Sequence, residues 1–246
     1  MLGLPIDNIT VKLGDSTLPH AEVEGGSWTA ASVAHAIATT ADAVRSVPTD
    51  RVNAVPQVRV SVDGLGIHAL HVRSPEPGAL PLVLTHGWPG SVVEFLKVVG
   101  PLADPRAHGG DPADAFHVVA PSLPGYGWSD GPTTTGWGVD RIACAWDTLM
   151  GALGYDRYGA QGGDWGATVT GSLAQQVPDR LVGVHVNMAT VVPDRSTLDD
   201  LSADEQRTLD DIAEHRATGT GYSTQQSTRP QTLGYGLPDS PAGQCA

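Results

Sequence analysis

An aspartate stands among glycines in the segment Gly162-Gly163-Asp164-Trp165-Gly166. The segment follows a short apolar run and precedes a helix-like one, so we expect the sharp strand-to-helix turn called a nucleophile elbow. Such a turn pushes its central side chain out over the sheet, at the N-terminus of the next helix. Asp164 takes the place that serine usually occupies, and a carboxylate is ionised at neutral pH without a base. The motif therefore predicts attack by Asp164 on an sp³ carbon to form an alkyl ester; the alternative is an aspartate that merely caps the helix.

A second turn, His86-Gly87-Trp88-Pro89, ends an earlier apolar run. In a sheet with an elbow, a turn at this place supplies a backbone N–H to an oxyanion hole. A plain turn is the alternative for this segment alone, but two such turns in this order favour a common site. We interpret His86 as a structural residue of the turn rather than a general base. The side chains of Trp88 and Trp165 could wall an apolar pocket, and core packing is the alternative for Trp165.

His68 and His71 have the spacing of a metal-binding pair, but they fall in an alternating run typical of a strand. Strand residues three apart point to opposite faces, so we expect no metal there. The sequence has neither a G-x-x-x-x-G-K-[S/T] nor a G-x-G-x-x-G string, and so gives no support for a nucleotide cofactor. We therefore expect chemistry without a cofactor or a metal.

The elements that must position these residues begin with a predicted hairpin. Two alternating runs flank Asp63-Gly64, a strong turn signal. Short apolar runs predict four further strands, each inside one of the segments Leu80–Gly90, Phe116–Asp130, Arg157–Val177 and Leu181–Ala189.

Helix signals lie between these strands. A capping box formed by Ser91 and Glu94 predicts a helix through Val99. The apolar period across 139–153 is the strongest helix signal, and a further helix follows the Asp164 turn. An Ala/Thr-rich pattern at Thr29–Val44 predicts a helix with a thin apolar face. Strands that alternate with helices predict an α/β fold with a mostly parallel sheet.

Length and charge bound the possible functions. The 246 residues leave room for a sizeable core. The 14 basic and 27 acidic residues give a net charge of −13, which disfavours nucleic acid and anionic membranes as partners. No apolar run reaches the roughly 18 residues that a membrane span requires. The N-terminus lacks a signal-peptide pattern, and Cys144 and Cys245 cannot make a disulfide framework, so we expect a cytoplasmic protein.

Together, several strings resemble epoxide hydrolases of the microsomal-like branch of the α/β-hydrolase superfamily: HGWPGSVVEF, PSLPGYGWS, QGGDWG, VNMA and GYSTQQSTRPQTLGYGLPDSPAG. The resemblance runs from about Asp50 to Ala246. It implies an α/β-hydrolase fold in which Asp164 opens a small apolar epoxide and water then releases a diol. The resemblance also implies an oxyanion hole made by the backbone N–H groups of Trp88 and Trp165. The motif residues that shape the two turns are His86, Gly87, Pro89, Gly162, Gly163 and Gly166.

Tyr222 falls where this family carries one of two cap tyrosines. The resemblance implies that its phenol donates a proton to the epoxide oxygen as the ring opens. The alternative is a tyrosine that only packs.

The sequence divides into a divergent N-terminal extension (1–56), a partial α/β-hydrolase core (57–192) and the start of a helical cap (193–246), with a capping box at Ser202 and Glu205. The family places a water-activating histidine and its acid partner after the cap, and this sequence shows no counterpart of either. Neither His185 nor His215 occupies that position. We expect a truncated form that is alkylated but does not turn over, with an exposed sheet edge that favours oligomers.

Two other functions stay open. An Asp-nucleophile dehalogenase would share attack at an sp³ carbon but would hold a halide with N–H donors, whereas Tyr222 favours an epoxide. A non-catalytic remnant or binding module would keep the pocket without turnover.

Overall fold

The computed structural model describes residues 50–189, 198 and 200–236. Contacts between Cα atoms divide the chain into one unit of Pro48–Val191 and another of Met1–Val47 with Val192–Ala246. The helix predicted at Thr29–Val44 lies outside the described residues. The three-part division of the sequence stays a prediction.

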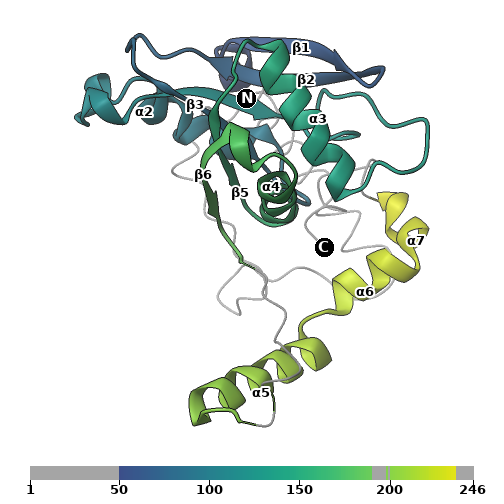
Figure 1. Cartoon of the computed structure of the whole chain (residues 1–246). Helices are drawn as coiled ribbons and strands as arrows, with labels where there is room; N and C mark the ends of the chain where they lie inside the picture. The colour runs from purple at the N-terminus through teal and green to yellow at the C-terminus, as the bar shows by residue number, and fades with distance from the viewer. Residues whose placement is uncertain (1–49, 190–197, 199, 237–246) are drawn as a thin grey trace, which may run out of the picture. The chain divides into compact units, whose positions relative to one another are not determined.

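The unit Pro48–Val191, which we call the core unit, is built around a six-stranded sheet (Figure 1). Its strands lie in the order β1-β2-β4-β3-β5-β6. β1 pairs antiparallel with β2, and β2 with β4, whereas β4, β3, β5 and β6 run parallel. The bounds are β1 Gln57–Val62, β2 Leu65–Val72, β3 Leu80–Thr85, β4 Phe116–Pro121, β5 Tyr158–Gly162 and β6 Leu181–Val186. The predicted mostly parallel α/β sheet is therefore confirmed.

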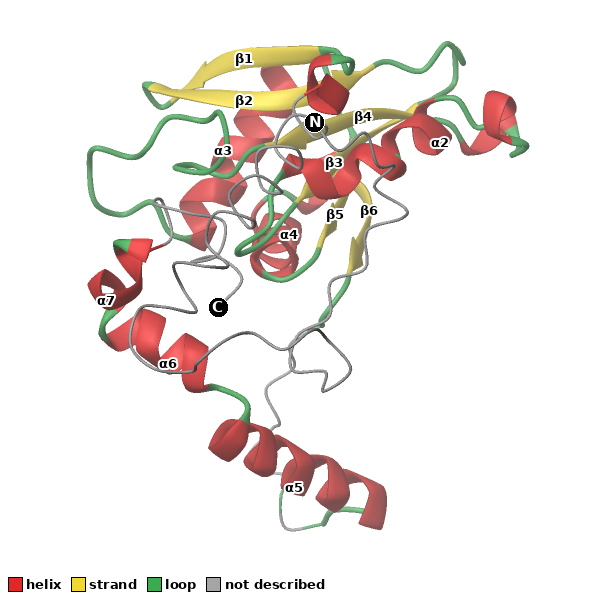
Figure 2. Cartoon of the chain, turned by 180° about the vertical axis from the view of Figure 1, so that it is seen from behind, coloured by secondary structure: helices red, strands yellow, loops and turns green. Residues whose placement is uncertain are grey.

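Helices connect the parallel strands (Figure 2). Two α-helices, α3 (Val139–Ala152) and α4 (Trp165–Gln176), precede β5 and β6 respectively. Shorter helical segments of the core unit include η2 Val92–Lys97, α2 Val99–Ala103, η3 Arg106–His108, η4 Pro112–Asp114 and η5 Pro178–Arg180. The helix predicted from the apolar period at 139–153 is confirmed by α3.

The hairpin of β1 and β2 turns at Asp63-Gly64, as predicted. Both residues have a positive φ, 51° at Asp63 and 76° at Gly64. Two positive φ angles are characteristic of the type I′ turn, whose twist matches that of the paired strands.

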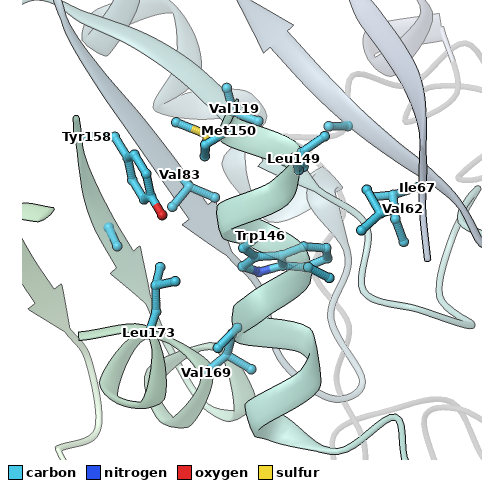
Figure 3. Packing of buried hydrophobic residues seen from close by; sticks show 14 of the residues in the cluster. Val62, Ile67, Val83, Val119, Trp146, Leu149, Met150, Tyr158, Val169 and Leu173 are labelled. Atoms are coloured by element: carbon cyan, nitrogen blue, oxygen red, sulfur yellow. The ribbon is translucent and has the colours of Figure 1, made fainter. Parts of the chain in front are cut away.

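Side chains from the two faces of the sheet form two separate apolar clusters. On one face, Trp146, Leu149 and Met150 of α3 pack with Leu173 of α4 and Val83 of β3 (Figure 3). On the other face, Leu84, the neighbour of Val83, packs with residues of η2 and α2. Because both faces are covered, β3 reads as a continuous apolar run rather than an alternating one.

The helix predicted after Ser91 differs from the structure. Instead of one α-helix, the chain forms a 3₁₀ helix, η2, followed by the short α2. Pro101 has no N–H to donate to the carbonyl of Lys97, so a continuous α-helix would lose a hydrogen bond there. The four valines of this segment add stiffness that disfavours the helix.

The other unit contributes three described helices, α5 Ala203–Thr218, α6 Gly221–Thr228 and α7 Pro230–Gly234. α5 begins with a complete capping box, in which Ser202 and Glu205 exchange hydrogen bonds, as predicted. Among the described helices, none has both the length and the apolar character that crossing a bilayer requires.

β6 has one neighbour in the described sheet, so its other edge is unpaired there. Val182 and Val184 on this strand are 52% and 50% exposed. An apolar edge of this kind promotes pairing between chains. We expect the double variant Val182→Lys/Val184→Lys to lower the weight-average mass in sedimentation experiments at high protein concentration. The matched control Val98→Lys, at a valine that is also exposed, should leave it unchanged; equal effects of both variants would contradict this expectation.

Candidate active site

The two motif turns lie next to each other because their strands are neighbours. β3 and β5 pair in parallel with Thr85 opposite Gly162, so both strands end at the same edge. The turn after β3 begins at His86, and the turn after β5 leads through Asp164 into α4. The N–H of Gly163 lies 3.4 Å from the Thr85 carbonyl oxygen, which links the two turns directly.

Asp164 has a backbone conformation that side-chain-bearing residues rarely adopt. Its φ is 52° and its ψ is −124°. Conformations of this kind cost roughly 1–3 kcal/mol and cluster at functional sites. The Asp164 side chain makes no hydrogen bond that caps α4, which argues against the alternative of a simple helix cap.

Three glycines of the motifs are needed because the chain packs against them. A Cβ on Gly162 would lie 2.0 Å from the carbonyl oxygen of Gly166, and one on Gly166 would lie 2.0 Å from that of Thr85. A Cβ on Gly87 would lie 2.2 Å from Oδ1 of Asp164. Gly163 differs, because a Cβ there would meet its nearest neighbour, Cβ of Asn187, at an ordinary 3.6 Å.

The backbone N–H of Trp88 donates a hydrogen bond of 2.7 Å to Oδ1 of Asp164. The carboxylate is half-buried, so one oxygen is held by the turn after β3. The N–H of Trp165 lies at the first position of α4, where helix N–H groups have no partner within the helix. Its part in an oxyanion hole stays a prediction.

His86 joins the turn to the next strand rather than acting on a ligand. The residue is buried, and its Nε2 accepts a 3.1 Å hydrogen bond from the N–H of Leu123. Since Nε2 is the acceptor, Nδ1 carries the proton and donates to the Gly87 carbonyl at 3.0 Å. Both ring nitrogens are engaged, which agrees with the structural role expected for His86.

His68 and His71 contact different partners. His68 bonds Ser122 Oγ at 2.9 Å and Gln57 Oε1 at 2.8 Å, whereas His71 bonds the Tyr155 hydroxyl at 2.9 Å. Their rings therefore serve separate polar networks on the two sides of β2.

We expect the core unit to lose stability as the pH falls below about 6.5. Burial is the main cause that lowers the pKa of four histidines below its ordinary value: His68, His71, His86 and His117. The unfolded chain therefore binds more protons than the folded chain in this range, and each excess proton costs about 1.4 kcal/mol per pH unit. Burial raises the pKa of Glu94 and acts in the opposite direction, but this is one group against four. Urea unfolding midpoints should decline from about pH 7 to about pH 5; a constant midpoint would contradict the assignment.

Tyr126 is a site residue that the sequence analysis did not single out. Its ring meets Trp88 edge-on with centroids 5.9 Å apart and lies 5.5 Å from the His86 ring. Burial and then the charge of Asp164 raise the pKa of its phenol, so the hydroxyl stays protonated at neutral pH. Tyr126 lies in a loop without periodicity, and its place there depends on tertiary contacts.

The loop that carries Tyr126 is fastened to the hairpin. Its base is held at Ser122, whose N–H donates to the His68 carbonyl at 2.9 Å. Its far end is held at Asp130, which accepts from the Gly66 N–H at 2.8 Å and pairs with Arg59. These contacts explain how an irregular segment can place an aromatic ring reproducibly.

Glu94 is a second residue that sequence reasoning placed differently. The predicted capping box does not form at this site: Ser91 is the N-cap of η2 and its Oγ accepts from the Val93 N–H instead of the Glu94 N–H, while the Glu94 side chain lines a cavity together with Asn187. The spacing Ser-x-x-Glu was the available signal, and it pointed to a helix cap instead of the site.

The remaining candidate residues lie elsewhere or stay untested. The Trp165 side chain is 53% exposed, so it does not pack in the core. Tyr222 lies on α6 of the other unit and is 65% exposed, and its proton-donor role stays a prediction. His185 lies on β6 and lines a cavity of about 590 Å³ with Glu94, Gln161 and Asn187.

A family model described as "alpha/beta hydrolase fold" matches residues 81–222, more than half of the sequence. The chain belongs to the α/β-hydrolase fold family. A second model, "Epoxide hydrolase N terminus", matches residues 5–95. The similarity therefore reaches further toward the N-terminus than the motif strings indicated.

Known proteins similar to this α/β-hydrolase chain carry epoxide hydrolase names. A proposed epoxide hydrolase of Stigmatella aurantiaca is 55% identical over 194 residues, which are 79% of this chain and 44% of that protein. Epoxide hydrolase 1 of Oryctolagus cuniculus is 35% identical over 213 residues, 79% of this chain and 47% of that protein. The chain therefore spans somewhat less than half the length of these relatives.

Solved structures of epoxide hydrolases are also similar to this chain. The epoxide hydrolase of Aspergillus niger has a TM-score of 0.66 at 35% identity, over 79% of this chain and 50% of that chain. The juvenile hormone epoxide hydrolase of the silkworm Bombyx mori has a TM-score of 0.69 at 34% identity, over 82% and 50%.

Proposed function

We propose that the chain carries the nucleophile half of an epoxide hydrolase, in which Asp164 opens a small apolar epoxide to form an ester that water converts to a diol. The observation that carries the proposal is the Asp164 carboxylate, displayed on a strained turn with Oδ1 bound by the Trp88 N–H at 2.7 Å. The names of the similar proteins support an epoxide as the substrate.

The hydrogen bond from the Trp88 N–H gives the two carboxylate oxygens of Asp164 different roles. Oδ1, held by Trp88, becomes the carbonyl oxygen of the ester. Oδ2 then attacks an epoxide carbon, the C–O bond of the ring breaks, and the ring oxygen leaves as an alkoxide that takes a proton. In the later attack of water on the ester, negative charge develops on Oδ1, where the Trp88 N–H already points.

The alkoxide needs a proton donor. We propose Tyr222 for this role, on the residue types that the cap string carries. Within the core unit, the ring of Tyr126 packs edge-on against Trp88, whose N–H holds Asp164, and the two rings supply an aromatic wall.

Ester hydrolysis needs a base that activates water. Among residues 50–189, the hydrogen bonds made by histidines all go to groups other than Asp164. An ester that activated water does not attack is released slowly, so the adduct on Asp164 is the species to measure.

Intact-mass measurement after incubation with styrene oxide tests the proposal. The free thiol of Cys144 is exposed and would itself react with epoxides, so both cysteines are first replaced by serine. We expect one added epoxide per chain, and none in the Asp164→Asn variant. Equal labelling of both proteins would contradict the proposal, and release of halide from a haloalkane without any epoxide adduct would favour a dehalogenase.

A further inference from the structure

One peptide unit of the turn after β3 carries a hydrogen bond at each of its two ends. The Trp88 N–H donates to Oδ1 of Asp164 at 2.7 Å. The carbonyl oxygen of Gly87 accepts from Nδ1 of His86 at 3.0 Å. That carbonyl and that N–H belong to the same planar trans peptide, so they point in opposite directions. Fixing the carbonyl oxygen therefore fixes the direction in which the N–H points.

The ring of His86 is itself held in place. Its Nε2 accepts a 3.1 Å hydrogen bond from the N–H of Leu123, and the residue is 1% exposed. Leu123 follows Ser122, whose N–H donates to the His68 carbonyl on β2 at 2.9 Å. A ring bound at both nitrogens cannot rotate without breaking a buried hydrogen bond, so His86 ties the turn after β3 to the loop after β4.

Hydrogen bonds in series also strengthen one another. A donor on the carbonyl oxygen draws electron density away from the amide nitrogen and makes its N–H a stronger donor. Here the series runs from the Leu123 N–H through the His86 ring and the turn peptide to Asp164. Burial is the main cause that lowers the pKa of His86, so the ring is neutral near pH 7 and Nε2 keeps the lone pair that accepts.

We propose that His86 is a positioning residue for cleavage of the Asp164 ester: it aims and polarises the Trp88 N–H through the carbonyl of the same peptide. This inference rests on the proposed function, which supplies the ester. A nucleophile that adds to the ester places negative charge on Oδ1, where the polarised N–H stabilises it. During alkylation Oδ1 loses charge instead, so the same N–H gives no comparable gain there. Both ring nitrogens of His86 bind backbone groups, so the residue acts through the peptide.

Cleavage of the styrene oxide adduct by hydroxylamine isolates this step. The hydroxylamine nitrogen adds to the ester carbonyl carbon and forms the oxyanion on Oδ1. The bond between that carbon and Oδ2 then breaks. The diol leaves with Oδ2 and a proton from the nitrogen, and Asp164 remains as a hydroxamate.

Asparagine and glutamine at position 86 separate the two hydrogen bonds. The amide nitrogen of asparagine takes the place of Nδ1 and can donate to Gly87, whereas the amide oxygen of glutamine takes the place of Nε2 and can accept from Leu123. Each variant therefore loses one of the two buried hydrogen bonds. Asparagine also leaves more empty volume, so a residue needed only for packing would tolerate glutamine better.

We expect the opposite order for the cleavage rate, measured by intact mass in the protein with both cysteines replaced by serine. His86→Gln should slow cleavage roughly tenfold, which is less than the roughly 100-fold or greater loss on removal of a whole oxyanion-hole donor. It should change the rate of adduct formation by less than about threefold. His86→Asn restores the donor to Gly87 and should recover cleavage to within about threefold of the parent rate.

Equal slowing by both substitutions, or greater slowing by His86→Asn, would overturn the proposal and leave His86 a purely structural residue. If His86→Asn does not fold, His86→Gln decides the matter alone. A loss in cleavage that exceeds the loss in adduct formation supports the proposal, and equal losses in both steps overturn it.

Backbone resonances give a second readout that needs no substrate. The carbonyl carbon of Gly87 and the amide proton of Trp88 should both lie upfield in His86→Gln relative to His86→Asn, because their hydrogen bonds weaken. Both variants lack the imidazole, so its ring current does not affect this comparison. If the parent protein forms no adduct, the proposed function fails. The resonances still report whether His86 acts on the peptide, and identical positions in the two variants would overturn that role.

Discussion

Gly166→Ala is expected to destabilise the core unit by about 3 kcal/mol or more, although alanine is the better helix former. Gly166 lies in the first turn of α4, where helix propensity alone would make alanine stabilising by up to about 1 kcal/mol. The added Cβ would lie 2.0 Å from the Thr85 carbonyl oxygen and 2.9 Å from that of His86. Both atoms belong to the backbone, so α4 or the end of β3 must move. The sign of the change in unfolding free energy therefore shows whether this close approach or the helix propensity of alanine dominates.

Gly163→Ala is the matched control for this prediction. The two glycines stand on either side of the Asp164-Trp165 pair, but a Cβ on Gly163 meets only side-chain atoms of Asn187, at 3.6 Å and beyond. We expect a change within about 0.5 kcal/mol. Urea denaturation of both variants measures the difference, and equal losses would show that the close approach of α4 to β3 is not what requires glycine.

Asp164→Gly is expected to abolish ester formation and at the same time to stabilise the protein by about 1 kcal/mol. The positive φ of 52° at Asp164 costs roughly 1–3 kcal/mol with a side chain present, and glycine adopts such angles freely. Part of this gain is offset because glycine has more freedom in the unfolded chain and because the Trp88 N–H loses its acceptor on Asp164. The substitution also removes the carboxylate that interacts with Glu94.

The variant Asp164→Asn separates the effect of backbone strain on stability from the effect of losing the carboxylate charge. Asparagine keeps the Cβ and hence the strain, so it should be inactive without the full gain in stability. Thermal melting of the parent, of both variants and of Asp164→Ala provides the comparison, because alanine also lacks the acceptor for the Trp88 N–H but keeps the Cβ. A melting temperature of Asp164→Gly that does not exceed that of Asp164→Ala would show that the turn is not strained as its dihedral angles indicate.

The site is predictable from sequence where local chemistry determines the backbone. The glycines around Asp164 predict a strand-to-helix turn, and the structure has β5 ending at Gly162 and α4 beginning at Trp165. The apolar period of α3 and the turn at Asp63-Gly64 are also local signals, and both elements form as expected.

The same spacing of serine and glutamate occurs at two helix starts, and a capping box forms at one of them and not at the other. Ser202 and Glu205 form a capping box on α5, where the acid is solvent-exposed. Ser91 and Glu94 do not, because the chain after Ser91 forms a 3₁₀ helix in which Ser91 Oγ accepts from the Val93 N–H. The type of helix that follows depends on Pro101 and on packing, which the spacing of serine and glutamate does not encode.

Tyr126 illustrates the same limit for a loop. Its string, PSLPGYGWS, indicated the family but not the direction of the ring. The ring reaches Trp88 and His86 because residues far away in sequence, on β2, hold both ends of the loop.

The central claim is that a carboxylate oxygen of Asp164 forms the covalent bond to the substrate, and peptide mapping tests this claim most directly. Cleavage after Arg157 and Arg180 yields the peptide Tyr158–Arg180, in which Asp164 and Asp179 are the acidic residues. After incubation of the cysteine-free protein with styrene oxide, fragmentation of this peptide should place one epoxide mass on Asp164, and hydroxylamine should remove it, as it does an ester. An adduct on Asp179 or on any other side chain, with Asp164 unmodified, would contradict the account.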